Sequence, residues 1–126
     1  MKVLLDTHAF LWAITDDRRL TQHARKILRT ADLFLSVASI WEIVTKVQIG
    51  KLPLPDAPSR YLPRHMAALG AQPLAIEAAH VMRLESLPLH HRDPFDRLLV
   101  AQSLEEKLPL LSADALLEPY GADIRW

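Results

Sequence analysis

Two carboxylates that could hold a cation, Asp93 and Asp96, stand three residues apart in a stretch with histidines and arginines, residues 90–97. Asp93 is a favourable N-cap residue and Pro94 suits the first helical position, so we expect a helix to begin here. Asp96 then falls in the first turn, where the helix dipole favours negative charge. Residues three apart are neighbours on a helix surface, so both side chains could face one metal ion or cationic partner. The same pattern is also how a helix simply begins.

Three more acids occupy comparable positions along the chain. Asp6 directly follows a short apolar run, and Asp114 closely follows another. Glu42 lies in the first turn of a predicted helix that comes after a third apolar run. Because the carboxyl ends of parallel strands meet at one edge of a sheet, these acids and Asp96 could converge there. Each also has a structural explanation: Asp6 could cap the next helix, and Ser39-x-x-Glu42 is a capping box.

Convergence of the four acids would have a chemical consequence. Carboxylates held close together repel one another unless a cation is bound between them. Mg²⁺ and Mn²⁺ are hard divalent ions that prefer oxygen ligands, and such a site would select them. The pattern of acids therefore predicts a centre for Mg²⁺ or Mn²⁺.

The composition limits the classes of protein to consider. The chain has 126 residues, which suit a single domain at 1–126, and half of them are hydrophobic, which allows a core. Lys and Arg number 15 and Asp and Glu 15, so no overall basic field points to nucleic acid, which would need a local basic patch or metal ions. The absence of cysteine excludes disulfides, thiolate zinc sites and cysteine nucleophiles. The first apolar run breaks at Asp6, too early for a signal peptide or membrane span, so we expect a cytoplasmic protein without membrane association.

The elements that must position the acids alternate between short apolar runs and helical patterns. We expect strands at residues 3–5, 33–37, 72–74, 109–111 and 122–126. We expect helices at residues 7–14, 21–30, 39–48, 59–69, 76–87 and 94–107. The helix at 76–87 carries Ala78, Val81 and Leu84 along one face. This alternation predicts an α/β fold with a mostly parallel sheet, in which Pro73 places its strand at an edge.

Four stretches of the sequence, taken in order, resemble PIN-domain proteins of the VapC toxin type. They are Leu4-Leu5-Asp6-Thr7-His8, Ser39-x-x-Glu42-Ile43 followed by Gly50-Lys51-Leu52, His91-Arg92-Asp93-Pro94-Phe95-Asp96-Arg97, and Leu110-Leu111-Ser112-Ala113-Asp114. The stretch at 91–97 is fairly specific by itself, and the ordered set covers essentially the whole chain. The resemblance implies a PIN-like three-layer α/β/α fold around a mostly parallel, twisted sheet of about four or five strands.

The same resemblance implies a Mg²⁺- or Mn²⁺-dependent endoribonuclease that hydrolyses RNA phosphodiesters with metal-activated water. The residues that match the family's acidic quartet, and so are expected to bind the ion and be catalytic, are Asp6, Glu42, Asp96 and Asp114. Thr7 and Ser112 match its small hydroxyl positions beside the acids. Asp93 is an extra acid that could cap the helix, support a metal-bound water, or do both.

Three basic side chains are candidates for holding RNA phosphates: Lys46, Arg92 and Arg97. Lys46 lies one turn beyond Glu42 and could pair with it instead, and Arg97 could equally pair with a neighbouring acid. The resemblance further implies the toxin of a toxin–antitoxin pair, with RNA as substrate, a cognate antitoxin as partner, and a homodimer. Leu11 and Trp12 offer apolar surface for a dimer or an antitoxin groove, although plain core packing also explains Leu11.

Other kinds of site fit the sequence less well. His90 and His91 are adjacent and cannot share a helix face, and no His-Glu-x-x-His pattern exists, which disfavours a histidine-ligated metal site. The patterns of a serine hydrolase and of a P-loop are also absent. The alternative that stays open is a non-catalytic PIN-like module that binds RNA or protein. A missing member of the acidic quartet would favour that alternative, but all four are present.

Overall fold

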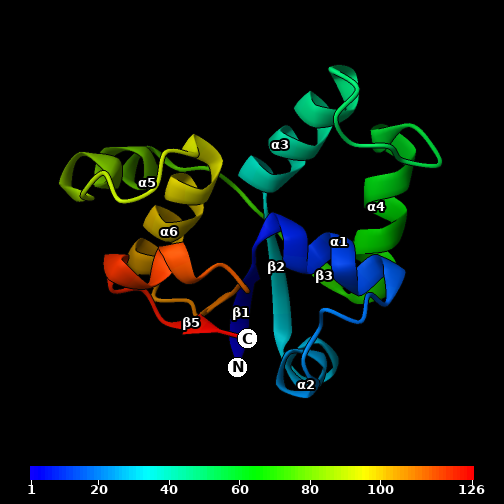
Figure 1. Cartoon of the computed structure of the whole chain (residues 1–126), viewed down its shortest axis with the longest axis horizontal. Coiled ribbons are helices and arrows are strands. Elements are labelled where there is room, and N and C mark those ends of the chain that lie inside the picture. The colour runs from blue at the N-terminus through cyan, green and yellow to red at the C-terminus, as the bar shows by residue number, and fades with distance from the viewer.

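Five strands form one sheet at the centre of the computed structural model, which describes residues 1–126 (Figure 1). In chain order they are β1 (Lys2–Leu5), β2 (Asp32–Ser36), β3 (Ala71–Leu74), β4 (Leu110–Leu111) and β5 (Ile124–Arg125). Their order across the sheet is β3-β2-β1-β4-β5, and every neighbouring pair is parallel. The predicted α/β fold with a mostly parallel sheet is confirmed, and the strand that contains Pro73 lies at an edge.

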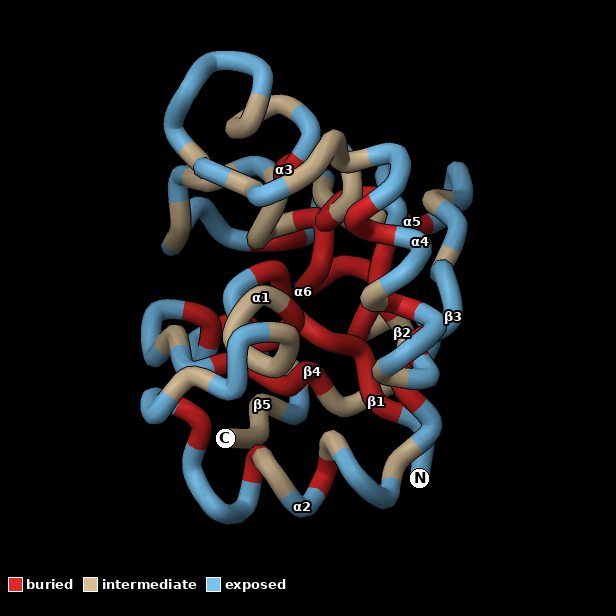
Figure 2. The backbone as a smooth tube through the Cα atoms, turned by 90° about the vertical axis from the view of Figure 1, so that its right-hand side faces the viewer, coloured by how far each residue is buried: buried red, intermediate tan, exposed pale blue.

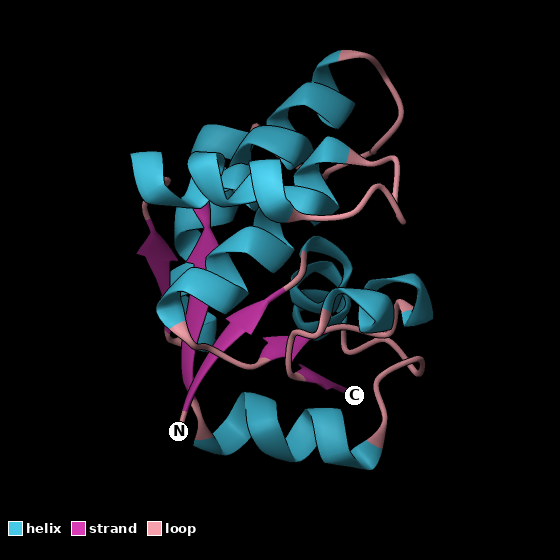
Figure 3. Cartoon of the chain, turned by 90° about the vertical axis from the view of Figure 1, so that its left-hand side faces the viewer, coloured by secondary structure: helices cyan, strands magenta, loops and turns pink.

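Helices cover both faces of this sheet. They are α1 (Thr7–Thr15), α2 (Gln22–Thr30), α3 (Val37–Gln48), α4 (Pro58–Leu69), α5 (Ala78–Arg83) and α6 (Pro94–Glu106), with short 3₁₀ helices η1 (Leu84–Ser86) and η2 (Ala115–Tyr120). Figure 1 shows α5 and α6 on one side of the strands and α1 and α4 on the other. Figure 3 shows the same strands, in magenta, enclosed by helices. No helix has the length and apolar character that crossing a bilayer requires.

The central strands are apolar throughout because each of their faces packs against helices. In β1, Val3 and Leu5 pack with residues of α1, α2 and α4, whereas Leu4 packs on the opposite face with residues of α6 and η2. All three side chains are fully buried, and Figure 2 shows β1 and β4 as buried backbone in the middle of the molecule. Continuous apolar strands are typical of a parallel sheet covered on both faces. Each such side chain contributes about 1.5–3 kcal/mol of burial free energy.

The order of the strands brings the acid-bearing segments together. β1 lies between β2 and β4, and the three strands run parallel. Their last residues are Leu5, Ser36 and Leu111, so the turns that follow them open at the same carboxyl edge. Open parallel sheets bind their ligands at this edge.

The start of α3 differs from the prediction. The helix begins at Val37, directly after β2, and the hydroxyl of Ser36 caps it by accepting the N–H of Ala38 at 3.0 Å. The predicted capping box of Ser39 and Glu42 is therefore wrong, since both residues lie inside the helix and are buried. The strand passes into the helix with no loop between them, which apolar periodicity could not reveal. Glu42 consequently has no capping role.

The helix predicted at 76–87 is shorter than expected and buries a different face. Val81 is 50% exposed and Ala78 is also exposed, whereas His80 is only 1% exposed. The polar ring can be buried because it is hydrogen-bonded to the backbone N–H of Glu77 at 2.9 Å and to a carboxylate of α6 at 2.8 Å. The predicted apolar face is wrong because it assumed that only apolar side chains turn inward.

Candidate metal centre

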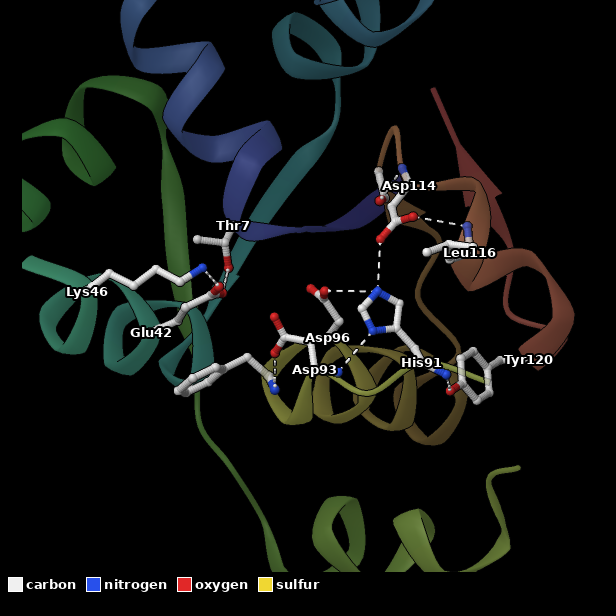
Figure 4. A network of polar contacts seen from close by, with 11 residues as sticks. Thr7, Glu42, Lys46, His91, Asp93, Asp96, Asp114, Leu116 and Tyr120 are labelled. Atoms are coloured by element: carbon white, nitrogen blue, oxygen red, sulfur yellow. Dashed lines mark hydrogen bonds and ion pairs between the residues drawn. The ribbon is translucent and has the colours of Figure 1, made fainter. Parts of the chain in front are cut away.

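The predicted acids lie together at the carboxyl edge of the sheet. Asp6 follows β1, Asp114 follows β4, Glu42 stands in α3, and Asp93 and Asp96 occupy the mouth of α6. Figure 4 shows that the side chains of the last four converge on a common space from their separate segments. Residues from both ends of the chain therefore contribute to a single acidic cluster.

Asp6 is both a helix cap and a member of this cluster. It is only 5% exposed, and its Oδ1 accepts the N–H of Ala9 in α1 at 2.7 Å. Burial raises the pKa of Asp6, while hydrogen bonds from the Ser112 hydroxyl and from the Ala9 amide act in the opposite direction. Ser112 Oγ also accepts the N–H of Asp114 at 3.1 Å. Ser112 thus ties the turn after β4 to the acid that follows β1.

Glu42 is held by partners on both of its carboxylate oxygens. Thr7 Oγ1 lies 2.6 Å from Glu42 Oε1 and 3.0 Å from Ser39 Oγ. A carboxylate only accepts, so the single Thr7 hydrogen goes to Glu42, and Ser39 donates to Thr7. Lys46 Nζ lies 2.5 Å from Glu42 Oε2. Partial burial lowers the pKa of Lys46, but the hydrogen bond and charge of Glu42 outweigh it, so the pKa is raised.

The pKa of Asp96 is shifted by its burial and by the other acids. This pKa is raised to about 7: burial contributes most, the carboxylates of Asp93, Glu42 and Asp6 add to it, and His91 acts in the opposite direction. Carboxylates from three elements therefore act electrostatically on this one group. Asp93 Oδ1 accepts a backbone N–H in the first turn of α6 at 2.9 Å, so its capping role is present. A role of Asp93 toward a metal-bound water stays a prediction.

His91 belongs to the cluster, and the reasoning from sequence missed it. Its Nε2 lies 3.1 Å from Asp114 Oδ2 and 3.4 Å from Asp96 Oδ2. One ligand atom from each of these three residues lies within 4.8 Å of the others. The sequence patterns that disfavour a histidine site concern pairs of histidines, whereas here one histidine stands among acids. Its position in the stretch at 91–97, two residues before a helix cap, was the available signal.

The three basic candidates lie in different environments. Lys46 pairs with Glu42, as one of the two alternatives predicted, and Arg92 is exposed in the loop before α6. Arg97 is turned elsewhere: its Nη2 donates to the carbonyl oxygens of Leu87 at 3.1 Å and Leu84 at 3.5 Å, and its buried Nε has no partner. Arg97 thus holds the backbone around η1, a placement that does not favour contact with RNA phosphates or with the acids.

The donor set of this edge fits a hard divalent ion. The carboxylates of the cluster offer oxygen ligands, which Mg²⁺ and Mn²⁺ prefer. Lys46 pairs with Glu42, but no lysine or arginine forms an ion pair with Asp6, Asp93, Asp96 or Asp114. The cluster therefore holds surplus negative charge, which the raised pKa of Asp96 reflects and which a divalent cation would neutralise.

The fold and this acidic edge define a parallel α/β domain with clustered carboxylates where ligands bind. The PIN domain family model matches residues 3–121, and the chain belongs to the PIN domain family. The predicted resemblance to PIN domains is thereby confirmed.

Individual relatives add detail to this assignment. Over 68 residues the chain is 35% identical to Ribonuclease VapC16 of Mycobacterium tuberculosis (strain ATCC 25618 / H37Rv). The matched residues make up 54% of this chain and 45% of that relative, so the match spans less than half of the relative's length. DNA-bound VapBC from Salmonella typhimurium has a TM-score of 0.74 at 15% identity, covering 99% of this chain and 97% of that one. VapBC2 from Rickettsia felis, bound to a DNA fragment from their promoter, has a TM-score of 0.73 at 11% identity and covers 99% and 98%. At these identities the two structures show a shared fold.

Proposed function

We propose that this chain is a divalent-metal-dependent endoribonuclease and the toxin of a VapBC-type toxin–antitoxin pair. The observation that carries the proposal is the meeting of Asp6, Glu42, Asp96 and Asp114 at one edge of the sheet, where Asp96 interacts electrostatically with Asp6 and Glu42, and Asp6 with Asp114. The name of the relative, Ribonuclease VapC16, supports the activity. The two solved neighbours described above are VapBC complexes, which supports the toxin role.

The four acids would hold Mg²⁺ or Mn²⁺ as catalytic residues. When bound, such an ion supplies Lewis-acid stabilisation of charge and activates water near neutral pH. Thr7 orients the carboxylate of Glu42 by donating a hydrogen bond to its Oε1. Ser112 links Asp6 to the turn that carries Asp114 by hydrogen bonds to both residues. Because these residues are largely buried, the charges interact in a medium of lower dielectric than water, where electrostatic stabilisation is stronger.

Lys46 and Arg92 are our candidates for binding the RNA backbone. Lys46 Nζ is bound to Glu42 at 2.5 Å, and an ion that shares the charge of Glu42 would loosen this pair. The ammonium group would then be available to a phosphate of the substrate beside the acids. Arg92 is exposed next to the mouth of α6, where its guanidinium can bind a phosphate with two parallel hydrogen bonds.

A groove beside the acids suits a segment of the antitoxin. Its volume is about 690 Å³, and its lining includes Thr7, Leu11, Trp12, Lys46 and Tyr61. Thr7 and Lys46 also contact Glu42, so the groove opens directly from the acidic cluster. We propose that an apolar antitoxin segment fills this groove, with Trp12 as part of the contact surface, and thereby blocks the cluster.

The proposed homodimer needs an apolar surface outside that groove. Trp41 and Val44 on α3 are 57% and 41% exposed, and Trp41 packs edge-on against Phe95 with ring centres 4.8 Å apart. We propose this face of α3 as part of the dimer interface. Sedimentation analysis of Trp41→Ser and Val44→Ser should show a shift toward monomer, and an unchanged dimer would exclude this face.

The activity is tested by incubating a mixed pool of labelled RNAs with purified, antitoxin-free protein. We expect cleavage with Mg²⁺ or Mn²⁺, none in EDTA, and a loss of about 100-fold or more for Asp96→Asn, because several kcal/mol of charge stabilisation would be lost. Asp32→Asn is the matched control, since Asp32 is an exposed acid at the opposite end of β2. If folded wild-type protein cleaves no RNA with either ion, the alternative of a non-catalytic RNA- or protein-binding module is favoured.

A further inference from the structure

Two hydrogen bonds fix His91, one made by its backbone and one made by its imidazole ring (Figure 4). The backbone N–H of His91 donates to Tyr120 Oη at 2.7 Å, which ties the loop before α6 to η2. The ring Nδ1 lies 3.0 Å from the backbone nitrogen of Asp93, which donates to it. The side chain is only 14% exposed, so the ring has little freedom to turn away from these partners.

These contacts determine which ring nitrogen carries the hydrogen. A backbone N–H can only donate, so Nδ1 must offer its lone pair to Asp93. In the neutral ring the hydrogen is then on Nε2. Nε2 faces Asp114 Oδ2 at 3.1 Å and Asp96 Oδ2 at 3.4 Å, so it donates to carboxylate oxygens. A nitrogen that bears a hydrogen has no lone pair for a metal ion, and this geometry makes His91 a donor to the acids rather than a ligand.

Asp114 is the acid that this donor fixes most firmly. Its Oδ1 accepts a hydrogen bond from the N–H of Leu116 at 3.0 Å, and its Oδ2 accepts one from Nε2–H of His91. The plane of the carboxylate is thus set at both oxygens, while each oxygen keeps a second lone pair. Asp114 follows β4 whereas Asp96 lies on α6, and the imidazole stands between the two segments.

We propose that His91 is a positioning residue of the metal centre: through its Nε2–H it holds Asp114 and Asp96 at the separation at which both can bind one divalent ion, and it is not itself a ligand. The inference rests on the proposed function, since it requires that the acids bind such an ion. Hydrogen bonds to ligating groups fix their orientation, and removing one typically lowers metal affinity about 10–100-fold.

The test is calorimetric titration of Mn²⁺ and of Mg²⁺ into wild type and three variants of His91. His91→Gln places an amide donor near the position of Nε2, whereas the shorter side chain of His91→Asn reaches only as far as Nδ1, and His91→Ala lacks both. We expect His91→Gln to keep wild-type affinity within a few-fold, and the Asn and Ala variants to lose about 10–100-fold for both ions. His90→Asn, a change of the exposed neighbouring histidine, is the matched control.

The ratio of the two affinities distinguishes positioning from ligation. A nitrogen ligand favours Mn²⁺ over Mg²⁺, so its loss would weaken Mn²⁺ binding more than Mg²⁺ binding. Loss of a positioning residue lowers the affinity for both ions by the same factor.

Long-range ¹H–¹⁵N NMR of the metal-free protein should in addition find His91 in the Nε2–H form. Melting temperatures in EDTA show which variants are folded. If the His91 variants are unfolded, Tyr120→Phe takes their place, because it removes only the anchor of the loop, and it should lower the affinity for both ions.

Each other outcome has a defined meaning. A wild-type protein that binds neither ion would overturn the proposed function and the inference with it. A wild type that binds both ions, with His91→Ala binding equally well, would overturn the inference alone. Tighter binding by His91→Ala would show that the imidazole competes with the ion, and selective loss of Mn²⁺ binding would show that it is a ligand. Either result would also overturn the inference.

Discussion

At the scale of single residues, Asp96 makes the stability of the metal-free protein depend on pH. Burial and neighbouring carboxylates raise its pKa to about 7 in the folded protein. An unfolded chain has an aspartate pKa of about 3.9, so the folded state retains a proton that the unfolded state releases. The stabilising contribution is therefore complete below about pH 4 and is lost as the pH rises through about 7.

We expect the free energy of unfolding of wild type, measured by urea denaturation in EDTA, to fall between about pH 4 and pH 7. Asp96→Asn should remove most of that fall, because its amide has no charge to lose. Asp32→Asn, at the opposite edge of the sheet, should retain it. Identical pH profiles for wild type and Asp96→Asn would contradict the buried, crowded environment of Asp96.

Thr7 gives a second prediction at this scale. Its hydroxyl donates to Glu42 Oε1 at 2.6 Å, and both residues are buried. Thr7→Val keeps the shape but leaves a buried carboxylate oxygen without its donor, which should lower the free energy of unfolding by about 1–3 kcal/mol. Thr7→Ser keeps the hydroxyl and should cost less. Urea denaturation of the two variants measures both losses, and a larger loss for Thr7→Ser than for Thr7→Val would show that methyl packing matters more than the hydrogen bond.

The acids could be predicted from the sequence because each stands where a strand ends or a helix begins. His91 could not, because its place between Asp96 and Asp114 depends on how η2 and the loop before α6 meet in space. Arg97 shows the reverse case: its position in a specific stretch suggested a contact with phosphate, whereas its guanidinium binds the carbonyl of Leu87. Sequence position gives a side chain's neighbours along the chain but not the direction in which it points.

At the scale of elements, a buried amide links the two helices that carry Glu42 and Asp96. Ser36, the cap of α3, lies 2.5 Å from Gln102 Oε1 on α6, and Gln102 Nε2 donates to the carbonyl of Ala75 at 3.3 Å. Gln102 is fully buried. This link sets how the start of α3 sits against α6, and therefore the relation of their acids.

We expect Gln102→Leu to lower the free energy of unfolding by about 1–3 kcal/mol, because it leaves buried polar partners unpaired despite a similar volume. Gln22→Leu, on the exposed first turn of α2, should change stability by less than about 0.5 kcal/mol. Thermal and urea unfolding measure both. A Gln102→Leu protein as stable as wild type would show that the polar link contributes nothing that packing cannot replace.

The sequence predicted the elements better than it predicted their ends. The helix from Asp93 onward follows the prediction closely because an N-cap, Pro94 and the apolar stretch that follows all favour it. The start of α3 was wrong because two serines, Ser36 and Ser39, both suit a cap, and only the tertiary structure selects the first. Local preference leaves such choices open, and packing against the sheet decides them.

At the scale of the whole molecule, the acidic cluster makes metal binding and stability interdependent. The acids are held together by the sheet despite their repulsion, so Asp96→Asn should stabilise the metal-free protein at pH 8 by on the order of a few kcal/mol. Wild type should gain about 2.7 kcal/mol at a Mn²⁺ concentration 100 times Kd, whereas Asp96→Asn should gain much less. Thermal melts with and without Mn²⁺ measure both effects. A variant that loses stability in EDTA yet keeps the gain from Mn²⁺ would contradict this account.

The alternation of apolar runs with helices predicted a parallel sheet, and parallel strands share one carboxyl edge whatever their order. The order β3-β2-β1-β4-β5 itself was not predicted, because it depends on which strands pair across long stretches of chain. That order places β1 between β2 and β4, so Asp6, which follows β1, lies between the segments that follow β2 and β4 and carry Glu42 and Asp114.

The most direct test of the central claim, a divalent metal centre at this edge, is a crystal structure of the protein with Mn²⁺ and its anomalous signal. We predict a peak coordinated by oxygens of the acidic quartet of Asp6, Glu42, Asp96 and Asp114, with His91 still hydrogen-bonded to Asp114 and outside the coordination sphere. An ordered cluster with no anomalous peak at saturating Mn²⁺, or a peak only elsewhere on the surface, would contradict the claim that these carboxylates form a metal centre.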